Sequence, residues 1–181
     1  MSPLEALDHY PLRQALLPGA AGLPVFATRG PVDWLSRPER YLVVCEGRGG
    51  RIYAAGELAL DEAQQVLRDA YGRKVVLRPP EVHTFDDPAG GGRCEPVMFL
   101  RLKSPRAHGA GLLKELARRR VRILEHDVRR DELVVRAEIR LADALGLNAA
   151  AERLTNGAAA LWTWLSRYDA AWLPPPPEAS R

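Results

Sequence analysis

The chain has 181 residues, of which 46% are hydrophobic and 27% charged, a composition typical of a globular protein with a real core. Its net charge of +3 permits a nucleic-acid partner without requiring one, because 23 acidic residues accompany 26 lysines and arginines. Neither a secretory leader nor an apolar run of about 18 residues is evident, which excludes a membrane-spanning class, and we expect a soluble, cytoplasmic protein.

Residues 1–40 are rich in prolines and glycines, which disfavour long regular elements. We expect a short helix near Leu4 to Leu17, followed by an irregular remainder of this N-terminal segment.

The sequence pattern changes at Tyr41. The runs YLVVCE and RIYAAG flank GRGG and predict a β-hairpin. ELALDEAQQVLRDAYG has apolar residues at helical spacing and ends at Gly72, and RKVVLRPPEV follows as a strand. Residues 41–85 are therefore predicted to form a partial, ferredoxin-like ββαβ unit, and the turn-rich DDPAGGGR at 86–93 is the expected linker.

Residues 94–173 predict a βαββαβ order. EPVMFLRLK is a strand, Ser104-Pro105 is a suitable helix start, and VRILEHDV and ELVVRAEIRL form a hairpin. A helix is expected from about Ala142 to Leu154, and AAALWTWLSRY is the last strand. The fold class is therefore α+β, a ferredoxin-like sandwich of an antiparallel four-stranded sheet with two helices on one face. A proline-rich tail follows at 174–181.

Strand alternation divides the charged residues of this sheet. In ELVVRAEIRL, the apolar set must face the helices, so Arg136 and Arg140 lie on the open face. Phe99 and Arg101 of the first strand join them there. The same alternation places Trp162 and Trp164 of the last strand on the open face.

From Glu95 to about Pro174 the chain resembles the C-terminal domain, domain V, of elongation factor G and related translational GTPases. The stretches that carry the resemblance are EPVM, SP, LARRR, VRAEIRLADALG, LTNG and RYD. A fainter likeness links AAGELALDEAQQVLRDAYGRKVVLRPPEV to the second half of domain III. The family's GTP-binding domain and domain IV have no counterpart in the sequence.

Several positions depart from the family pattern. Val121 stands where the family has a glycine, Ala59 where it has a histidine, and Ala158 where it has an arginine. GRGGR at 47–51 lacks the lysine and hydroxyl of a phosphate-binding loop, so we expect neither nucleotide binding nor GTP hydrolysis.

The resemblance implies docking on the ribosome through the arginines at the end of the first domain V helix, namely Arg118, Arg119, Arg120 and Arg122. The alternative is a structural role, in which these cations complement the helix dipole and pair with Glu115 and Glu125.

The open sheet face, formed by Phe99, Arg101, Arg136, Arg140, Trp162 and Trp164, also has more than one interpretation. In the first interpretation another part of the chain covers this face. In the second a protein partner, such as a second copy, binds to it. In the third single-stranded RNA stacks on its rings.

No catalytic, metal or cofactor site is expected. His83, Asp86 and Asp87 are the nearest approach to a cluster, with Cys94 beyond them, but turn-forming aspartates explain them. Cys45 and Cys94 lack metal-binding spacing and are expected to be buried or idle thiols. We thus expect a non-catalytic translation-factor-like protein that binds the ribosome or rRNA. The alternative is a protein-interaction module, homodimeric through the Trp162/Trp164 face and without a ribosomal role.

Overall fold

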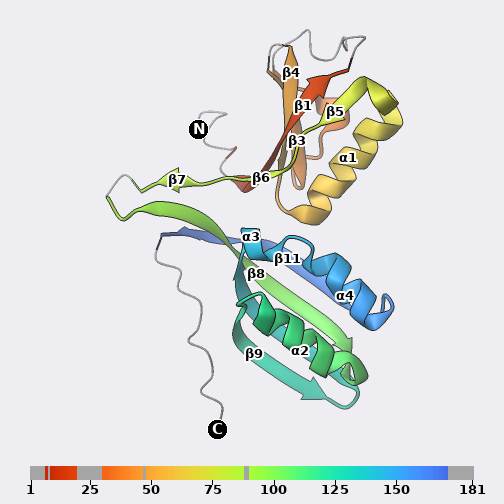
Figure 1. Cartoon of the computed structure of the whole chain (residues 1–181), viewed down its shortest axis with the longest axis vertical. Helices are drawn as coiled ribbons and strands as arrows, with labels where there is room; N and C mark the ends of the chain where they lie inside the picture. Colours follow the sequence, from red (N-terminus) through yellow and green to blue (C-terminus); the bar gives the residue numbers. More distant parts are fainter. Residues whose placement is uncertain (1–6, 8, 20–29, 47, 88–89, 171–181) are drawn as a thin grey trace. The chain divides into compact units, whose positions relative to one another are not determined.

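The structure is a computed structural model that describes residues 7, 9–19, 30–46, 48–87 and 90–170. The chain divides into two compact units, Met1–His83 and Thr84–Arg181, each built on its own sheet (Figure 1). Within the described ranges, every helix is too short or too polar to cross a lipid bilayer.

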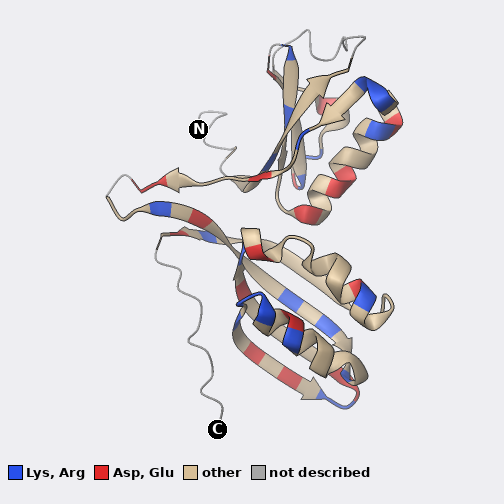
Figure 2. Ribbon diagram, in the orientation of Figure 1, with Lys and Arg blue, Asp and Glu red and all other residues tan. Residues whose placement is uncertain are grey.

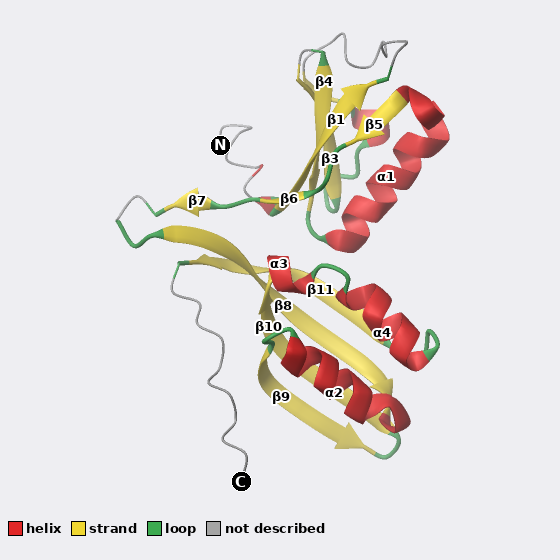
Figure 3. Ribbon diagram, in the orientation of Figure 1, coloured by secondary structure: helices red, strands yellow, loops and turns green. Residues whose placement is uncertain are grey.

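The first unit is an antiparallel sheet with helix α1 (Glu57–Tyr71) packed on it (Figure 3). Its strands run in the order β2-β3-β4-β1-β5, and β6 also pairs with β1. The bounds are β1 (Leu12–Pro18), β2 (Gly30–Pro31), β3 (Tyr41–Glu46), β4 (Gly49–Ala54), β5 (Val75–Leu77) and β6 (Glu81–Val82). The order β3, β4, α1, β5 confirms the elements predicted from Tyr41 onward.

Strand β1 shows that the predicted N-terminal helix is wrong. Leu12, Gln14 and Leu16 are buried and alternate with partly exposed residues, which is the period of a strand. β1 pairs with β4 on one side and with β5 on the other, so long-range pairing decides its conformation. The strand β2 and the short 3-10 helix η3 (Asp33–Leu35) are the other regular elements named in this segment; residues 1–6, 8 and 20–29 lie outside the described residues.

The second unit has the predicted ferredoxin-like βαββαβ order. Its strands β8 (Arg93–Pro105), β9 (Arg122–Arg129), β10 (Glu132–Arg140) and β11 (Ala160–Asp169) pair antiparallel in the order β11-β8-β10-β9. Helices α2 (Gly109–Arg118) and α4 (Leu147–Thr155) lie over the same face of this sheet (Figure 1). The fold class expected from the sequence is confirmed.

The central strands β8 and β10 fix the two faces of that sheet. They pair without a break from Val97 opposite Arg140 to Pro105 opposite Glu132. The residues of β10 that face the helices are at most 2% exposed, namely Leu133, Val135, Ala137 and Ile139. The intervening positions, including Arg136 and Arg140, therefore project to the open face, as predicted.

The predicted linker at 86–93 begins and ends inside the second unit. β7 (Phe85–Asp86) pairs with the start of β8, with Phe85 opposite Cys94. The Phe85 ring also lies 4.9 Å from the Tyr168 ring, centroid to centroid. The boundary between the two units consequently falls between His83 and Thr84, before the glycine-rich stretch.

Two predicted helix boundaries in this unit are wrong. Ser104 is 3% exposed within β8, and α2 begins only at Gly109, after the 3-10 helix η5 (Arg106–His108). The helix expected over 142–154 is interrupted: α3 (Leu141–Ala144) is separated from α4 by Gly146, whose φ of 75° is left-handed.

Helix α2 ends in a Schellman motif with an arginine at the position that favours glycine. The Arg120 N–H donates to the Ala117 carbonyl at 3.0 Å, and the Val121 N–H donates to the Leu116 carbonyl at 3.1 Å. Arg120 has φ 57°, a conformation that disfavours residues with a Cβ. Val121, which stands where the family has a glycine, is a buried residue, and the left-handed position is that of Arg120.

Arg120→Gly should stabilise the chain by about 0.5–1 kcal/mol, because glycine removes the left-handed strain at a modest entropic cost. Urea unfolding followed by circular dichroism measures the difference. The matched control is Lys114→Gly at a surface position inside α2, which should cost about 1 kcal/mol. Equal destabilisation by both changes would contradict the left-handed assignment.

Candidate functional site

The basic cluster at the end of α2 begins with Arg118. Its guanidinium donates from Nε to Glu115 Oε2 at 2.8 Å and from Nη2 to Oε1 at 2.7 Å. The Arg118 side chain nevertheless remains 66% exposed, against 14% for Glu115. Arg118 thus keeps a surface on which a phosphate can compete for its hydrogen bonds.

Arg119 is committed to the fold. Its Nε donates to Glu115 at 2.7 Å, and its Nη1 donates to the carbonyl oxygens of Asp143 at 2.8 Å and Leu145 at 2.7 Å. Those carbonyls lie at the break between α3 and α4, where backbone acceptors lack helical partners. Arg119 thus joins the end of α2 to this break. With only 14% of its side chain exposed, it is poorly placed to bind a ligand.

The two arginines also set the acidity of Glu115. Hydrogen bonds first from Arg118 and then from Arg119 lower the pKa of Glu115 to about 2, against the opposing effect of its burial. The predicted pairing with Glu115 is therefore confirmed for two members of the cluster.

The remaining members, Arg120 and Arg122, lie at the surface. Arg122 Nη1 lies 3.7 Å from Glu138 Oε2, too far for a hydrogen bond, and its side chain is 54% exposed. Glu125, expected to pair with this cluster, instead accepts from Arg136 Nη1 at 2.7 Å. The structure thus leaves Arg118, Arg120 and Arg122 as the accessible cations of the cluster.

Aromatic and cationic side chains lie together on the half of the open sheet face formed by β8 and β11. Phe99 and Trp164 stack with centroids 4.7 Å apart and an interplanar angle of 29°. The Arg101 guanidinium carbon lies 5.8 Å from the centroid of Trp162. The tryptophans are 46% and 48% exposed, which confirms their predicted placement on the surface.

Arg136 and Arg140 of β10 form ion pairs with carboxylates of β9, β8 and α3. Besides the Arg136–Glu125 pair, Arg140 contacts Asp143 at 3.0 Å and Glu95 at 3.5 Å. Figure 2 shows basic and acidic residues along β9. Arg136 and Arg140 are thus paired with carboxylates of the same chain, whereas the tryptophan rings keep about half of their surface exposed.

A contact that alternation alone could not reveal joins Arg167 to Glu138. Arg167 donates two hydrogen bonds to this carboxylate, one of them from Nη2 to Oε2 at 3.2 Å, and Glu138 is only 9% exposed. By simple alternation Arg167 would share the helix side with Leu165, but the pairing of β11 with β8 shifts by one residue between them. The sequence shows the RYD stretch that contains Arg167, but it does not show the bulge that brings Arg167 to Glu138.

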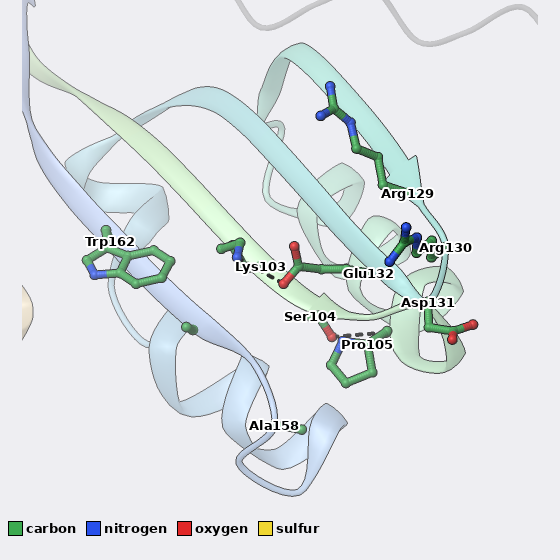
Figure 4. Close-up of a pocket in the computed structure, with 10 residues that line it drawn as sticks. Lys103, Ser104, Pro105, Arg129, Arg130, Asp131, Glu132, Ala158 and Trp162 are labelled. Carbon is green, nitrogen blue, oxygen red and sulfur yellow. Dashed lines mark hydrogen bonds and ion pairs between the residues drawn. The ribbon is translucent and has the colours of Figure 1, made fainter.

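A hollow of about 770 Å³ lies beside Trp162 where β8 ends and β10 begins (Figure 4). Its walls include Lys103, Pro105, Arg130 and Glu132, and Lys103 Nζ pairs with Glu132 Oε1 at 2.9 Å. No pattern in the sequence indicates this hollow, because its walls come from separate strand ends.

The described residues contain no group of three or more histidine, cysteine or acidic side chains arranged to hold a metal ion. Cys94 is buried, and desolvation followed by the charge of Asp87 raises the pKa of its thiol, which disfavours the nucleophilic thiolate. His83 is the last residue of the first unit and Cys94 belongs to the second, so the two are not parts of one compact unit.

The second unit is similar to known proteins. Residues 92–176 match the family model of the elongation factor G C-terminus. A mitochondrial ribosome-releasing factor 2 from Danio rerio is 33% identical over 81 residues, which cover 45% of this chain and 11% of that protein. A crystal structure of a protein from Thermus thermophilus matches 90% of this chain and 41% of its own with a TM-score of 0.54; at 18% identity this shows the fold alone.

Glu115→Gln should destabilise the chain at pH 7 by about 1 kcal/mol, the upper range for an ion pair near the surface. The folded pKa of Glu115 lies below its usual value of 4.5, so its contribution is present above that value and is lost as the pH falls toward 2. Urea unfolding at pH 7, 4 and 2.5 should show that the difference in the free energy of unfolding between the unchanged chain and the variant decreases as the pH falls.

The control is Glu152→Gln, an exposed change in α4 that should shift stability by less than about 0.5 kcal/mol at each pH. If Glu115→Gln lowered the free energy of unfolding by the same amount from pH 7 to 2.5, the assigned ion pairs would be contradicted.

Proposed function

We propose that the chain is a non-catalytic, translation-factor-like protein of the cytoplasm that binds the ribosome, because residues 92–176 match the family model of the elongation factor G C-terminus. Ribosomal RNA supplies the phosphates, and the chain neither hydrolyses GTP nor requires a cofactor. The similarity to a ribosome-releasing factor supports a role in translation.

The observation that carries this proposal is the basic cluster at the end of α2. Arg118, Arg120 and Arg122 keep accessible side chains, whereas Arg119 is committed to the helix junction. Guanidinium groups bind phosphate oxygens through paired hydrogen bonds, and each phosphate contact releases counterions. Binding should therefore be driven by a few accessible arginines and should weaken steeply with salt.

A protein-interaction role is the second candidate, and the exposed tryptophans favour it. Trp162 and Trp164 are each nearly half exposed, and tryptophan is enriched where protein interfaces derive their affinity. On this second proposal the chain forms a homodimer or binds another protein through the side of the sheet that carries both rings.

Arg118→Glu combined with Arg120→Glu should weaken ribosome co-sedimentation by at least about tenfold at low salt, because two cations become anions at the docking surface. The salt dependence of the residual binding should also become shallower by about one unit for each phosphate that is no longer bound. Pelleting of the full chain with purified ribosomes across a salt series measures both effects.

The control makes the same charge change at the tip of the β9–β10 hairpin, Arg129→Glu with Arg130→Glu. It should leave co-sedimentation within about twofold, since long-range effects of surface charge are screened by salt. Equal losses in both double variants would indicate a general charge effect and would contradict a docking role for the end of α2.

A further inference from the structure

Strand β11 forms one edge of the second unit's sheet. Among the described residues it pairs with β8 on its inner side, and no strand pairs with its outer side. The strand is long, Ala160–Asp169, and an edge strand of this length presents a row of backbone donors and acceptors to any strand that approaches.

The two edges of this sheet are built differently. The β9 edge carries charged residues along its length, including Glu125, Asp127 and Arg129, and its pairing with β10 shifts register near Arg136. Charges along a strand protect an edge from pairing with other chains. The β11 edge also shifts register, between Leu165 and Arg167, but its stretch ALWTWLS from Ala160 to Ser166 has no charged residue.

Both faces of β11 are incompletely covered. On the open face the tryptophans are 46% and 48% exposed, and on the helix face Leu161, Thr163 and Leu165 are each only half-buried. The neighbouring strand shows the contrast, because Leu100 and Leu102 of β8 are at most 1% exposed. A ligand lying on the open face alone would leave the leucine side uncovered. An occupant that covers both faces must lie alongside the strand, with side chains that extend each of them.

We propose that a second copy of this chain pairs antiparallel with β11 and joins the two sheets edge to edge. The stretch from Ala160 to Ser166 is uncharged and largely apolar, so it complements itself better than it complements an acidic or a basic partner. With Thr163 at the twofold axis, Trp162 of each copy lies opposite Trp164 of the other. Such an isologous contact satisfies both copies with one surface.

The rings are held in place for this contact before it forms. Trp164 is stacked on Phe99 and Trp162 lies beside the Arg101 guanidinium, so association costs less side-chain freedom. Each half-exposed tryptophan still offers about 100 Å² of the roughly 150–250 Å² that such side chains bury. Four rings would supply about 400 Å², and the paired backbones and leucines bring the contact toward the roughly 1,200 Å² of a small specific interface.

This inference rests on the second candidate function, which it makes specific, and it does not require ribosome binding. It predicts a concentration-dependent dimer of the full chain, because a small interface gives modest affinity. It also assigns that dimer to a strand edge rather than to a stack of two open faces.

Charge complementation tests the proposal. One variant carries Trp162→Lys with Trp164→Lys and the other carries Trp162→Glu with Trp164→Glu. Each alone should be monomeric by analytical ultracentrifugation at concentrations where the unchanged chain dimerises, because like charges meet across the pair. An equimolar mixture should recover the dimer. The matched control, Leu124→Lys with Val128→Lys, places the same charges at similarly exposed positions of β9 and should dimerise normally.

Hydrogen exchange distinguishes the edge from the face. Edge pairing should slow exchange of the amides of residues 160–166 as the concentration rises, while those of β9 stay unchanged. The proposal is overturned if the unchanged chain is monomeric at about 200 µM, where even a weak interface of this kind should associate. It is also overturned if the dimer forms without protecting 160–166.

Discussion

The unbroken antiparallel register between β8 and β10 is the constraint on which the rest of the second unit depends. From Val97 opposite Arg140 to Pro105 opposite Glu132, it places the apolar side chains of alternate β10 positions beneath the helices and the charged ones on the other side. A slip of one residue would reverse both faces, so the core and the open face are specified together. The ladder between β11 and β8 then places the tryptophans on the open face, because Trp162 lies opposite Arg101 and Trp164 opposite Phe99.

The helices supply the other surface, and one arginine divides it into structural and accessible parts. Arg119 binds the carbonyls at the break between α3 and α4 and so holds the end of α2 in place. Arg118 and Arg120, on either side of it in sequence, remain accessible. The arginines look alike in the sequence, but Arg119 is largely buried and structural, whereas its neighbours are cations that a phosphate can reach.

The sequence predicts the features that depend on neighbouring residues and misses those that depend on residues far apart in the chain. Alternation in β10 and the order of elements from Glu95 depend on local pattern, and both predictions are confirmed. Strand β1 depends on partners some 40 and 60 residues away in β4 and β5, so the local pattern of its proline-flanked sequence wrongly predicts a helix. The Arg167–Glu138 pair depends on a bulge, and the role of Arg119 on unpaired carbonyls; neither leaves a signature in residue spacing.

The end of α2 and the edge of β11 are, in our proposal, separate surfaces with separate partners. Ribosome co-sedimentation of the Trp162→Ala, Trp164→Ala variant tests this separation most directly, because the change removes the rings of one surface and leaves the arginines of the other untouched. We expect binding within about twofold of the unchanged chain at every salt concentration, since the phosphate contacts are retained. Loss of ribosome binding in a variant that remains folded would contradict the separation of the two surfaces.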